Sequence, residues 1–505
     1  MKAKKTALLF FLSITMGHVF AANYYWKPNY AVLNFDWSDL NNWVTTSGGS
    51  VHPVVLPGPA DDVIIDPTCL VARVELYDTA VCHSISFVPP LSAGPANPII
   101  TNGGSGYPLE VYGSFNGCTN LEMSLTVDFV SGASGNIIDM DTPIATGSPL
   151  DNLNVYFKGA GDWTLASPLT AWVVYVENGT LKTNNNNMHS RDFEIIGDST
   201  RSVLFGQSSL VLSDPGGFRV DGTNYTIDAD SASFRLKTDQ GIALAFLGGE
   251  NQHYHYVEMD TLAPTAGVSG INCVIDHLVS YGTLMTLSMT GSIHKAEFFG
   301  GGSISDNASN GNLVYDTLVM DNTVPPSFGN NGDYFMDSDS TFVNNLLQIN
   351  SGSGDTIAIT EYWGGYANIL HLPADTLCLD YLKLRNTHAA GAGYYFAGSN
   401  SVDLGNNSGW AFSACNAVAT GISTVNDKED LLLYPNPATS SVTVRNGTAI
   451  HLYRIYSVTG ALIRAGEMKN YKEEFTIDLT ELHKGLYFIE LTTDQGVIMK
   501  KIAKQ

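Results

Sequence analysis

Positive charge is scarce in this chain of 505 residues, which has 25 Lys and Arg against 49 Asp and Glu. Residues 428–505 hold ten basic and nine acidic residues, and residues 1–21 hold three basic residues and no acidic ones. That leaves 12 basic and 40 acidic residues in residues 22–427. Binding to phosphate needs clustered Lys and Arg. This acidic segment therefore excludes nucleic acid as a partner and disfavours polyanionic glycans.

Long apolar runs are equally scarce. The longest covers residues 7–14, follows Lys2, Lys4 and Lys5, and precedes the small-residue site at Ala21. This arrangement is typical of a secretory signal peptide, predicted here over residues 1–21, and is too short for a membrane anchor. No other stretch approaches the length of a transmembrane helix, so we expect no transmembrane segment.

The motifs of several enzyme classes are missing. The sequence has no GxSxG, HExxH or GxxxxGK[ST] motif, and no GxGxxG motif followed by a helix, so nothing indicates a serine hydrolase, a zinc protease or nucleotide use. No CxxC spacing occurs among the six cysteines. Oxidising export makes Cys69–Cys82 and Cys378–Cys415 plausible disulfides, and buried reduced thiols are the alternative.

Helical periodicity is also nearly absent from residues 22–415. Short runs of Val, Ile, Leu, Phe and Tyr are broken by Gly, Asn, Asp and Ser about every ten residues. Apolar-aromatic runs closed by glycine recur at residues 155–159, 244–249 and 296–301. We predict an all-β fold in which a parallel β-helix, or β-solenoid, forms this body. Serial antiparallel β-sandwiches are the alternative.

The two ends of the body carry a resemblance. Trp37, Trp43 and the Asp-Asp-Val-Ile-Ile run at 61–65 resemble the opening of exported β-helical surface proteins, in which tryptophans cap the first coil. Residues 379–387 and 395–410 are similar to a final coil of large Bacteroidota surface proteins. The resemblance implies a fold and a location, and it implies no reaction.

The last 78 residues resemble the C-terminal (type A) sorting domain of the type IX secretion system of Bacteroidota. The resemblance rests on Tyr434, Pro435, Asn436, Pro437, Gly460, Leu482, Gly485, Tyr487, Lys500 and Lys501. Alternating strands separated by glycines independently predict a small immunoglobulin-like β-sandwich of about seven short strands. The resemblance implies export through the periplasm to the outer cell surface or the medium. It also implies the secretion machinery and its surface-attachment enzyme as partners.

The shift from an acidic to a near-neutral composition marks a domain boundary. We expect a signal peptide at 1–21, the acidic body at 22–415, a linker at 416–427 and the sorting domain at 428–505.

Candidate sites in the body are few. His253 and His255 lie two residues apart, so on a strand both imidazoles face the same side and could bind one metal ion with a third ligand from another coil. An exposed polar pair is the favoured interpretation, and we predict no metal. The local carboxylate pairs Asp61–Asp62, Asp228–Asp230 and Asp337–Asp339 could serve glycoside hydrolysis or Ca²⁺ binding, but a solvated acidic surface is favoured.

Sugar contact and glycosylation complete the candidates. Tyr362, Trp363 and Tyr366 gather around a glycine turn where aromatic rings could stack on sugars, although packing at a coil edge is the favoured interpretation. Eight Asp-Ser/Thr triplets resemble the O-glycosylation sequon of Bacteroidota, and their acceptors are Thr79, Ser199, Ser231, Thr261, Thr317, Ser340, Thr356 and Thr376.

These features predict a secreted or cell-surface protein without an enzymatic motif, acting as an adhesin-like or structural surface element. Glycans and other surface proteins are the expected partners of the body. The alternative is a β-helical carbohydrate-active enzyme acting on a neutral polysaccharide.

Overall fold

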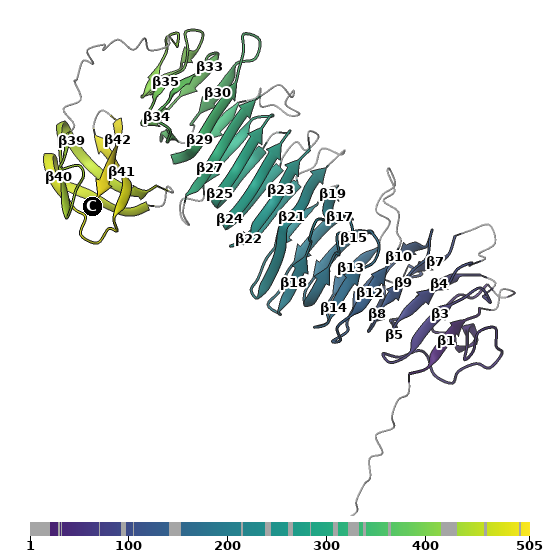
Figure 1. Ribbon diagram of the computed structural model, residues 1–505. Helices are drawn as coiled ribbons and strands as arrows, with labels where there is room; N and C mark the ends of the chain where they lie inside the picture. The colour runs from purple at the N-terminus through teal and green to yellow at the C-terminus, as the bar shows by residue number, and fades with distance from the viewer. Residues whose placement is uncertain are drawn as a thin grey trace, which may run out of the picture.

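The computed structural model describes residues 21–28, 31, 33–69, 71–91, 97–104, 106–140, 153–213, 216–237, 244–260, 266–282, 284–306, 312–321, 333–336, 340–361, 365–415, 432–458, 462–493 and 496–505. These residues form an elongated β-solenoid and a separate antiparallel C-terminal domain (Figure 1). Within this part of the chain Leu40–Asn42 forms a 3-10 turn, and no helix has the length and hydropathy needed to cross a membrane.

The solenoid has three rows of strands, which the chain visits in the order A, B, C. Row A begins with β1 (Asn23–Trp26) and continues through β3 (Asp62–Ile65), β6 (Ile85–Phe87), β9 (Phe115–Asn116), β12 (Asn136–Asp139), β14 (Asp162–Leu165), β16 (Gly179–Lys182) and β18 (Arg201–Leu204). Row B begins with β4 (Arg73–Glu75), β7 (Ile99–Thr101) and β10 (Glu122–Ser124). Row C begins with β5 (Ala80–Cys82), β8 (Pro108–Val111), β11 (Thr126–Phe129) and β13 (Asn154–Phe157).

From β15 onward, longer strands turn the corners between rows. They are β15 (Leu169–Val176), β17 (Met188–Ile195), β21 (Tyr225–Lys237), β23 (His253–Met259), β24 (Ala266–Ser280), β25 (Leu284–Phe298), β27 (Leu313–Asp321) and β29 (Ser340–Asn350). Shorter strands complete these coils: β19 (Ser209–Ser213), β20 (Gly217–Val220), β22 (Leu244–Glu250), β26 (Gly302–Asp306), β28 (Tyr334–Met336), β30 (Ile357–Thr360) and β31 (Ala367–His371).

The last coils contain β32 (Thr376–Cys378), β33 (Leu382–Arg385), β34 (Thr387–Gly391), β35 (Tyr394–Phe396), β36 (Val402–Asp403) and β37 (Trp410–Ala411). All pairings between the solenoid strands described are parallel, except that β1 pairs antiparallel with β2 (Trp43–Val44). The predicted solenoid is therefore confirmed, and the serial sandwiches are excluded.

Alternation along each strand builds the core. In β13, Val155 and Phe157 are fully buried, while Asn154 and Tyr156 face outward. Parallel pairing in register stacks inward residues into columns, so Phe129 lies on Phe157 with ring centroids 5.3 Å apart. A single apolar cluster extends in this way from Tyr24 to Ala397. Each coil buries its neighbour's apolar edge, as in other repeat architectures.

Tryptophans close the N-terminal end of the core. Trp26, Trp37 and Trp43 are almost fully buried, and the rings of Trp26 and Trp37 each lie 4.8 Å from that of Trp43 in edge-to-face contact. Trp43 Nε1 donates to the carbonyl of Trp37 at 2.8 Å, so its polar atom is satisfied. The Asp-Asp-Val-Ile-Ile run does form a strand, β3, but this strand has four residues and pairs with β1.

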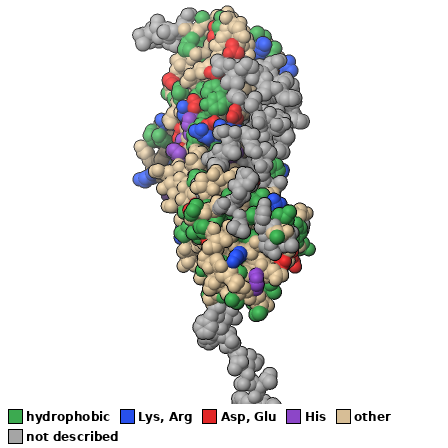
Figure 2. Space-filling view, turned by 90° about the vertical axis from the view of Figure 1, so that its right-hand side faces the viewer, with side chains coloured by type: hydrophobic (Ala, Val, Ile, Leu, Met, Phe, Trp, Pro, Cys, Tyr) green, Lys and Arg blue, Asp and Glu red, His purple; other side chains and the backbone are tan. Residues whose placement is uncertain are grey.

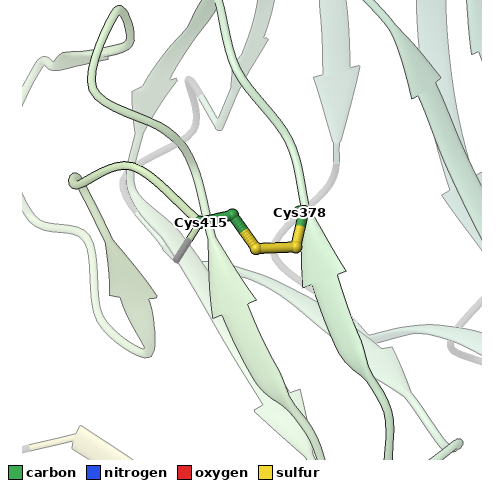
Figure 3. Close-up of a disulfide and its surroundings, with 2 residues drawn as sticks. All are labelled: Cys378 and Cys415. Carbon is green, nitrogen blue, oxygen red and sulfur yellow. A yellow bond between two sulfur atoms is a disulfide. The ribbon is translucent and has the colours of Figure 1, made fainter. Parts of the chain in front are cut away.

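A disulfide ties the last coils together. Cys378, in β32, is bonded to Cys415, which follows β37 (Figure 3). The other proposed pair is wrong, because Cys69 and Cys82 are separate buried thiols. Burial raises the pKa of the Cys69 thiol to about 11, which keeps it protonated and unreactive.

Asparagines at the turns link successive coils. Asn184 and Asn185 have φ values of 53° and 62°, a left-handed conformation that Asn tolerates better than most residues. Asn185 Oδ1 accepts from the backbone N–H of Gln207 in the next coil at 2.8 Å. Similarly, Asn406 Nδ2 donates to Asn386 Oδ1 at 3.1 Å, which links two successive coils at another corner.

The C-terminal domain contains β38 (Leu432–Tyr434), β39 (Ser441–Ser457), β40 (Leu462–Asp478), β41 (Gly485–Thr493) and β42 (Gly496–Lys504). The pairings are antiparallel, in the order β38-β39-β41-β42, with β40 also on β39. The first half of β39 pairs with β38, and its second half pairs with β41. Each long strand therefore replaces two of the predicted short ones, around a separate apolar core that includes Val442, Ile489 and Ile502.

Candidate functional site

The two histidines noted in the sequence, His253 and His255, lie in a histidine–carboxylate cluster at the corner between rows A and B. They belong to β23, Asp276 to β24 and His294 to β25, while Asp230 comes from β21. The registers β23–β24 and β24–β25 bring these positions together from four successive coils. Because coils are about 4.8 Å apart, side chains of neighbouring coils are within hydrogen-bond reach.

Asp276 is the centre of this cluster. Its Oδ1 lies 2.8 Å from His253 Nε2 and 3.0 Å from His294 Nδ1, and its Oδ2 lies 3.1 Å from His255 Nδ1. The second ring nitrogen of His253, Nδ1, lies 2.9 Å from Asp230 Oδ1. Both nitrogens of His253 therefore face carboxylates, and the doubly protonated imidazolium satisfies both contacts.

The protonation of the cluster follows from these contacts. The hydrogen bond to Asp276 is the main cause that raises the pKa of His253 above its ordinary value, against partial desolvation. Burial opposes ionisation of Asp276, but the hydrogen bonds from His253 and His255 prevail and lower its pKa. The cluster is thus a proton-dependent ion-pair network at the surface.

The imidazoles of the cluster are engaged with carboxylates. Within the described ranges, no group of three or more His, Cys, Asp or Glu side chains is placed to hold a metal ion. Sequence reasoning found His253 and His255 through their i, i+2 spacing. It missed Asp276 and His294, and it named Asp230 as part of a carboxylate pair without connecting it to the histidines, since their proximity depends on a register that the sequence does not state.

The carboxylate pairs have structural partners. Asp61 accepts hydrogen bonds from the backbone N–H groups of Ala22 at 2.9 Å and Gly58 at 3.0 Å, and Asp62 lies 2.8 Å from His83. Asp228 and Asp230 are both exposed on β21, where Asp230 contacts His253. The pair at 337 and 339 lies outside the described residues.

Of the three aromatic residues at the glycine turn, Tyr366 is described and Tyr362 and Trp363 are not. Tyr366 is 46% exposed, and its ring lies 4.2 Å from that of His388, as expected for packing at a coil edge. On the face shown in Figure 2, the described residues are mainly uncharged, with charged side chains scattered among them.

A second aromatic group, on the outer face of row C, was missed. Tyr156 and Tyr175 are in register on β13 and β15, and their rings stack with centroids 4.9 Å apart. Glu194 follows in the next coil, and Arg219 lies 3.7 Å from it in the coil after that. Burial is the main cause that raises the pKa of Glu194 above its ordinary value. Because carboxylates and aromatic rings share this face, it could contact a sugar.

A pocket of about 450 Å³ lies beside the N-terminal cap. Its lining includes Lys27, Asn34, Asp39, Asn42 and His52, so it has a single acidic group and no second carboxylate to complete an acid–base pair. Asp39 already accepts from Asn34 Nδ2 at 2.7 Å.

The glycosylation candidates differ in accessibility. Thr79, Ser199, Ser231 and Thr376 are exposed, whereas Thr317 and Thr356 are half-buried. Thr261 and the side chain of Ser340 lie outside the described residues. The four exposed hydroxyls remain predicted acceptors.

In the C-terminal domain, the first motif is joined to the last strand. Tyr434 ends β38, and Asn436 Nδ2 donates to the carbonyl of Lys501 at 2.9 Å. The backbone N–H of Ala503 returns a bond to Asn436 Oδ1 at 3.0 Å. The two ends of the domain are thereby held together, with Pro435, Asn436 and Pro437 exposed.

The other motif residues have structural roles as well. Leu482 is buried in the domain core, Gly485 begins β41, and Tyr487 donates through its hydroxyl to the carbonyl of His483 at 2.9 Å. Lys501 is exposed and Lys500 is half-buried on β42, while Gly460 lies outside the described residues.

Comparison with known proteins assigns the domain. The family model for the secretion system C-terminal sorting domain matches residues 432–505. No curated protein and no solved structure matched the chain in the comparisons. The chain therefore ends in a sorting domain of the type IX secretion system, which directs it to the cell surface or the surrounding medium.

Proposed function

We propose that this protein is an adhesin-like or structural element of the cell surface, and that its acidic solenoid makes the contacts outside the cell. One observation carries the proposal: a single apolar core continues from Tyr24 to Ala397, and a sorting domain occupies residues 432–505 of the same chain. Such an unbroken core makes the body one stiff rod. A rod with a long lateral surface suits contact with an extended partner.

The partners follow from the two parts of the chain. The secretion machinery and its surface-attachment enzyme act on the sorting domain, while glycans or other surface proteins contact the body. Export begins with the signal peptide at residues 1–21 and passes through the periplasm of a Bacteroidota cell.

The experiment compares cells with and without this protein. We expect its loss to reduce attachment to surfaces or cell–cell aggregation, and expression of the complete chain to restore both. Unchanged attachment and aggregation, together with glycan-degrading activity of the purified protein, would refute the adhesin-like role.

The second candidate is a carbohydrate-active enzyme acting on a neutral polysaccharide, and the outer face of row C favours it. Tyr156 and Tyr175 place aromatic side chains on this face for contact with a sugar, and Glu194, whose pKa burial raises, is suited to act as a proton donor. The purified chain should be screened against neutral glycans for both binding and cleavage. Glu194→Gln should abolish cleavage, and Tyr175→Ala should weaken binding, whereas the control Glu122→Gln on row B should change neither. Binding without cleavage would support the adhesin-like role instead.

A further inference from the structure

In row A, one column of outward-facing side chains changes from mostly polar to apolar along the solenoid. The register places Thr164, Lys182, Leu204 and Asp228 in successive coils, and later His253, Val274 and Ser292. The next four coils continue the column with Val314, Phe342, Leu370 and Ala390. A column that is mostly polar or charged thus becomes wholly apolar at the end of the body.

These four side chains point away from the solenoid core. Their chain neighbours Leu313, Val343 and Ile369 belong to that core, and alternation directs Val314, Phe342 and Leu370 to the other side. Four coils at a spacing of about 4.8 Å give an apolar stripe about 14 Å long. Such a stripe on an outer face indicates a contact surface.

The sorting domain covers this apolar stripe. Phe342 is 2% exposed and Leu370 is 1% exposed, in a cluster that includes Tyr456 of β39. The rings of Phe342 and Tyr456 lie 5.5 Å apart, and Phe488 and Met499 pack beside them. In Figure 1 the domain lies next to the last coils, where β34 contacts β42.

The covering face is a second apolar face of the domain. The domain's own core consists of other residues, including Val442, Ile489 and Leu491. Tyr456 and Phe488 are paired across β39 and β41, and both contact the solenoid instead of that core. Each partner therefore presents apolar side chains that lie outside its own core.

Docking in this orientation leaves the first sorting motif accessible. Tyr434 is 43% exposed, and Pro435, Asn436 and Pro437 are exposed as well. Lys501, whose carbonyl accepts the Asn436 bond, is also exposed. The covered side chains Tyr456, Phe488 and Met499 lie apart from this motif in the sequence.

We propose that the apolar stripe formed by Val314, Phe342, Leu370 and Ala390 is a docking platform for the protein's own sorting domain. The platform holds the domain against the folded end of the body with its first motif facing outward. It consequently ties presentation of the export signal to correct folding of these four coils.

The test uses the purified chain from residue 22 to 505, with Phe342→Asp as the variant. A charge in the stripe releases the domain, so the maximum dimension from small-angle scattering should increase. The rate of Met499 oxidation in hydroxyl-radical footprinting should rise about twofold or more, because oxidation follows exposure. Ser292→Asp, in the same column but before the apolar stripe, is the matched control and should change neither value.

A second variant distinguishes release of the sorting domain from misfolding of the body. Tyr456→Lys breaks the contact from the side of the sorting domain and should give the same two changes, while circular dichroism confirms retained β structure. In the double variant Phe342→Asp/Tyr456→Lys, the opposite charges should restore docking and return Met499 oxidation toward its original rate. Unchanged scattering and oxidation in both folded single variants would overturn the proposal.

Discussion

At the scale of single residues, Asp276 shows how the solenoid creates chemistry that no one strand contains. Three histidines from two other strands point at its carboxylate, and a second carboxylate, Asp230, holds the far side of His253. Parallel strands in register bring side chains of successive coils close together at the same corner. Here they place Asp and His side chains in alternating coils. The histidine–carboxylate cluster therefore makes the stability of the folded protein depend on pH.

The sign of this pH dependence follows from the pKa shifts of His253 and Asp276. The raised pKa of His253 gives stability that is fully present below its unfolded value of about 6.5 and is lost as the pH rises through its folded pKa. The lowered pKa of Asp276 gives stability that is present above its unfolded value of about 3.9 and is lost as the pH falls through its folded pKa. The contribution is therefore greatest between these limits.

Asp276→Asn should consequently lower the thermal midpoint most near pH 5.5 and much less at pH 8.5. Since the histidines are about half exposed, the expected loss is only about 0.5–1 kcal/mol. Melting of both proteins across this pH range measures it, with the exposed Asp228→Asn as control. If the two proteins differed equally in thermal midpoint at both pH values, the cluster would not contribute pH-dependent stability.

Residue spacing revealed part of this site and could not reveal the rest. His253 and His255 are two apart, so the sequence alone predicts a shared face. Asp276 and His294 lie 21 and 39 positions beyond His255 in the numbering. Coil lengths vary, and shifts of register occur within β24, so no fixed period connects them. The Tyr156–Tyr175 stack was missed for the same reason.

At the scale of elements, the ends of the solenoid need special residues because each terminal coil lacks one neighbour. Trp43 fills this role at the N-terminus, fully buried against Trp26 and Trp37. Trp43→Ala should cost about 3–5 kcal/mol locally. Hydrogen exchange should therefore accelerate in β1, β3 and β6, and remain unchanged in β24 and β25. Val54→Ala, at a position 89% exposed, is the control.

The other end is secured covalently. Cys378 and Cys415 are 37 positions apart, and closing a loop of this length stabilises by about 3–4 kcal/mol in the chain-entropy model. Reduction should thus speed hydrogen exchange in β32, β35 and β37 without affecting β3 or β6. Protection that is unchanged by a reductant in the last coils would show that packing alone holds them.

The presence of the strands was easier to predict from the sequence than their lengths. Alternation predicted the elements and the solenoid, because burial on one side imposes a period of two. The seven short strands expected at the C-terminus became five, since β39 and β40 bend instead of ending. The turn signals are the same for a bend and for a break, so composition alone does not separate them.

At the scale of the whole molecule, the chain joins an acidic rod to a near-neutral export module. The shift in composition predicted two parts, and the match over residues 432–505 assigns the second. The sequence did not reveal that the parts touch. An apolar stripe on an outer face is visible only when the register shows that Val314, Phe342 and Leu370 share a column.

Deleting residues 432–505 tests whether the sorting domain, and not the body, is needed for delivery to the cell surface. The body keeps its own core and the predicted signal peptide, so we expect it to fold and reach the periplasm but no longer to reach the cell surface. Protease digestion of intact cells, followed by immunoblotting of the fractions, distinguishes the two locations. The full chain carrying Asp228→Asn should be delivered normally and controls for expression. Digestion of the truncated body on intact cells would show that the signal for delivery lies in the solenoid itself, and the sorting domain would then serve a different purpose.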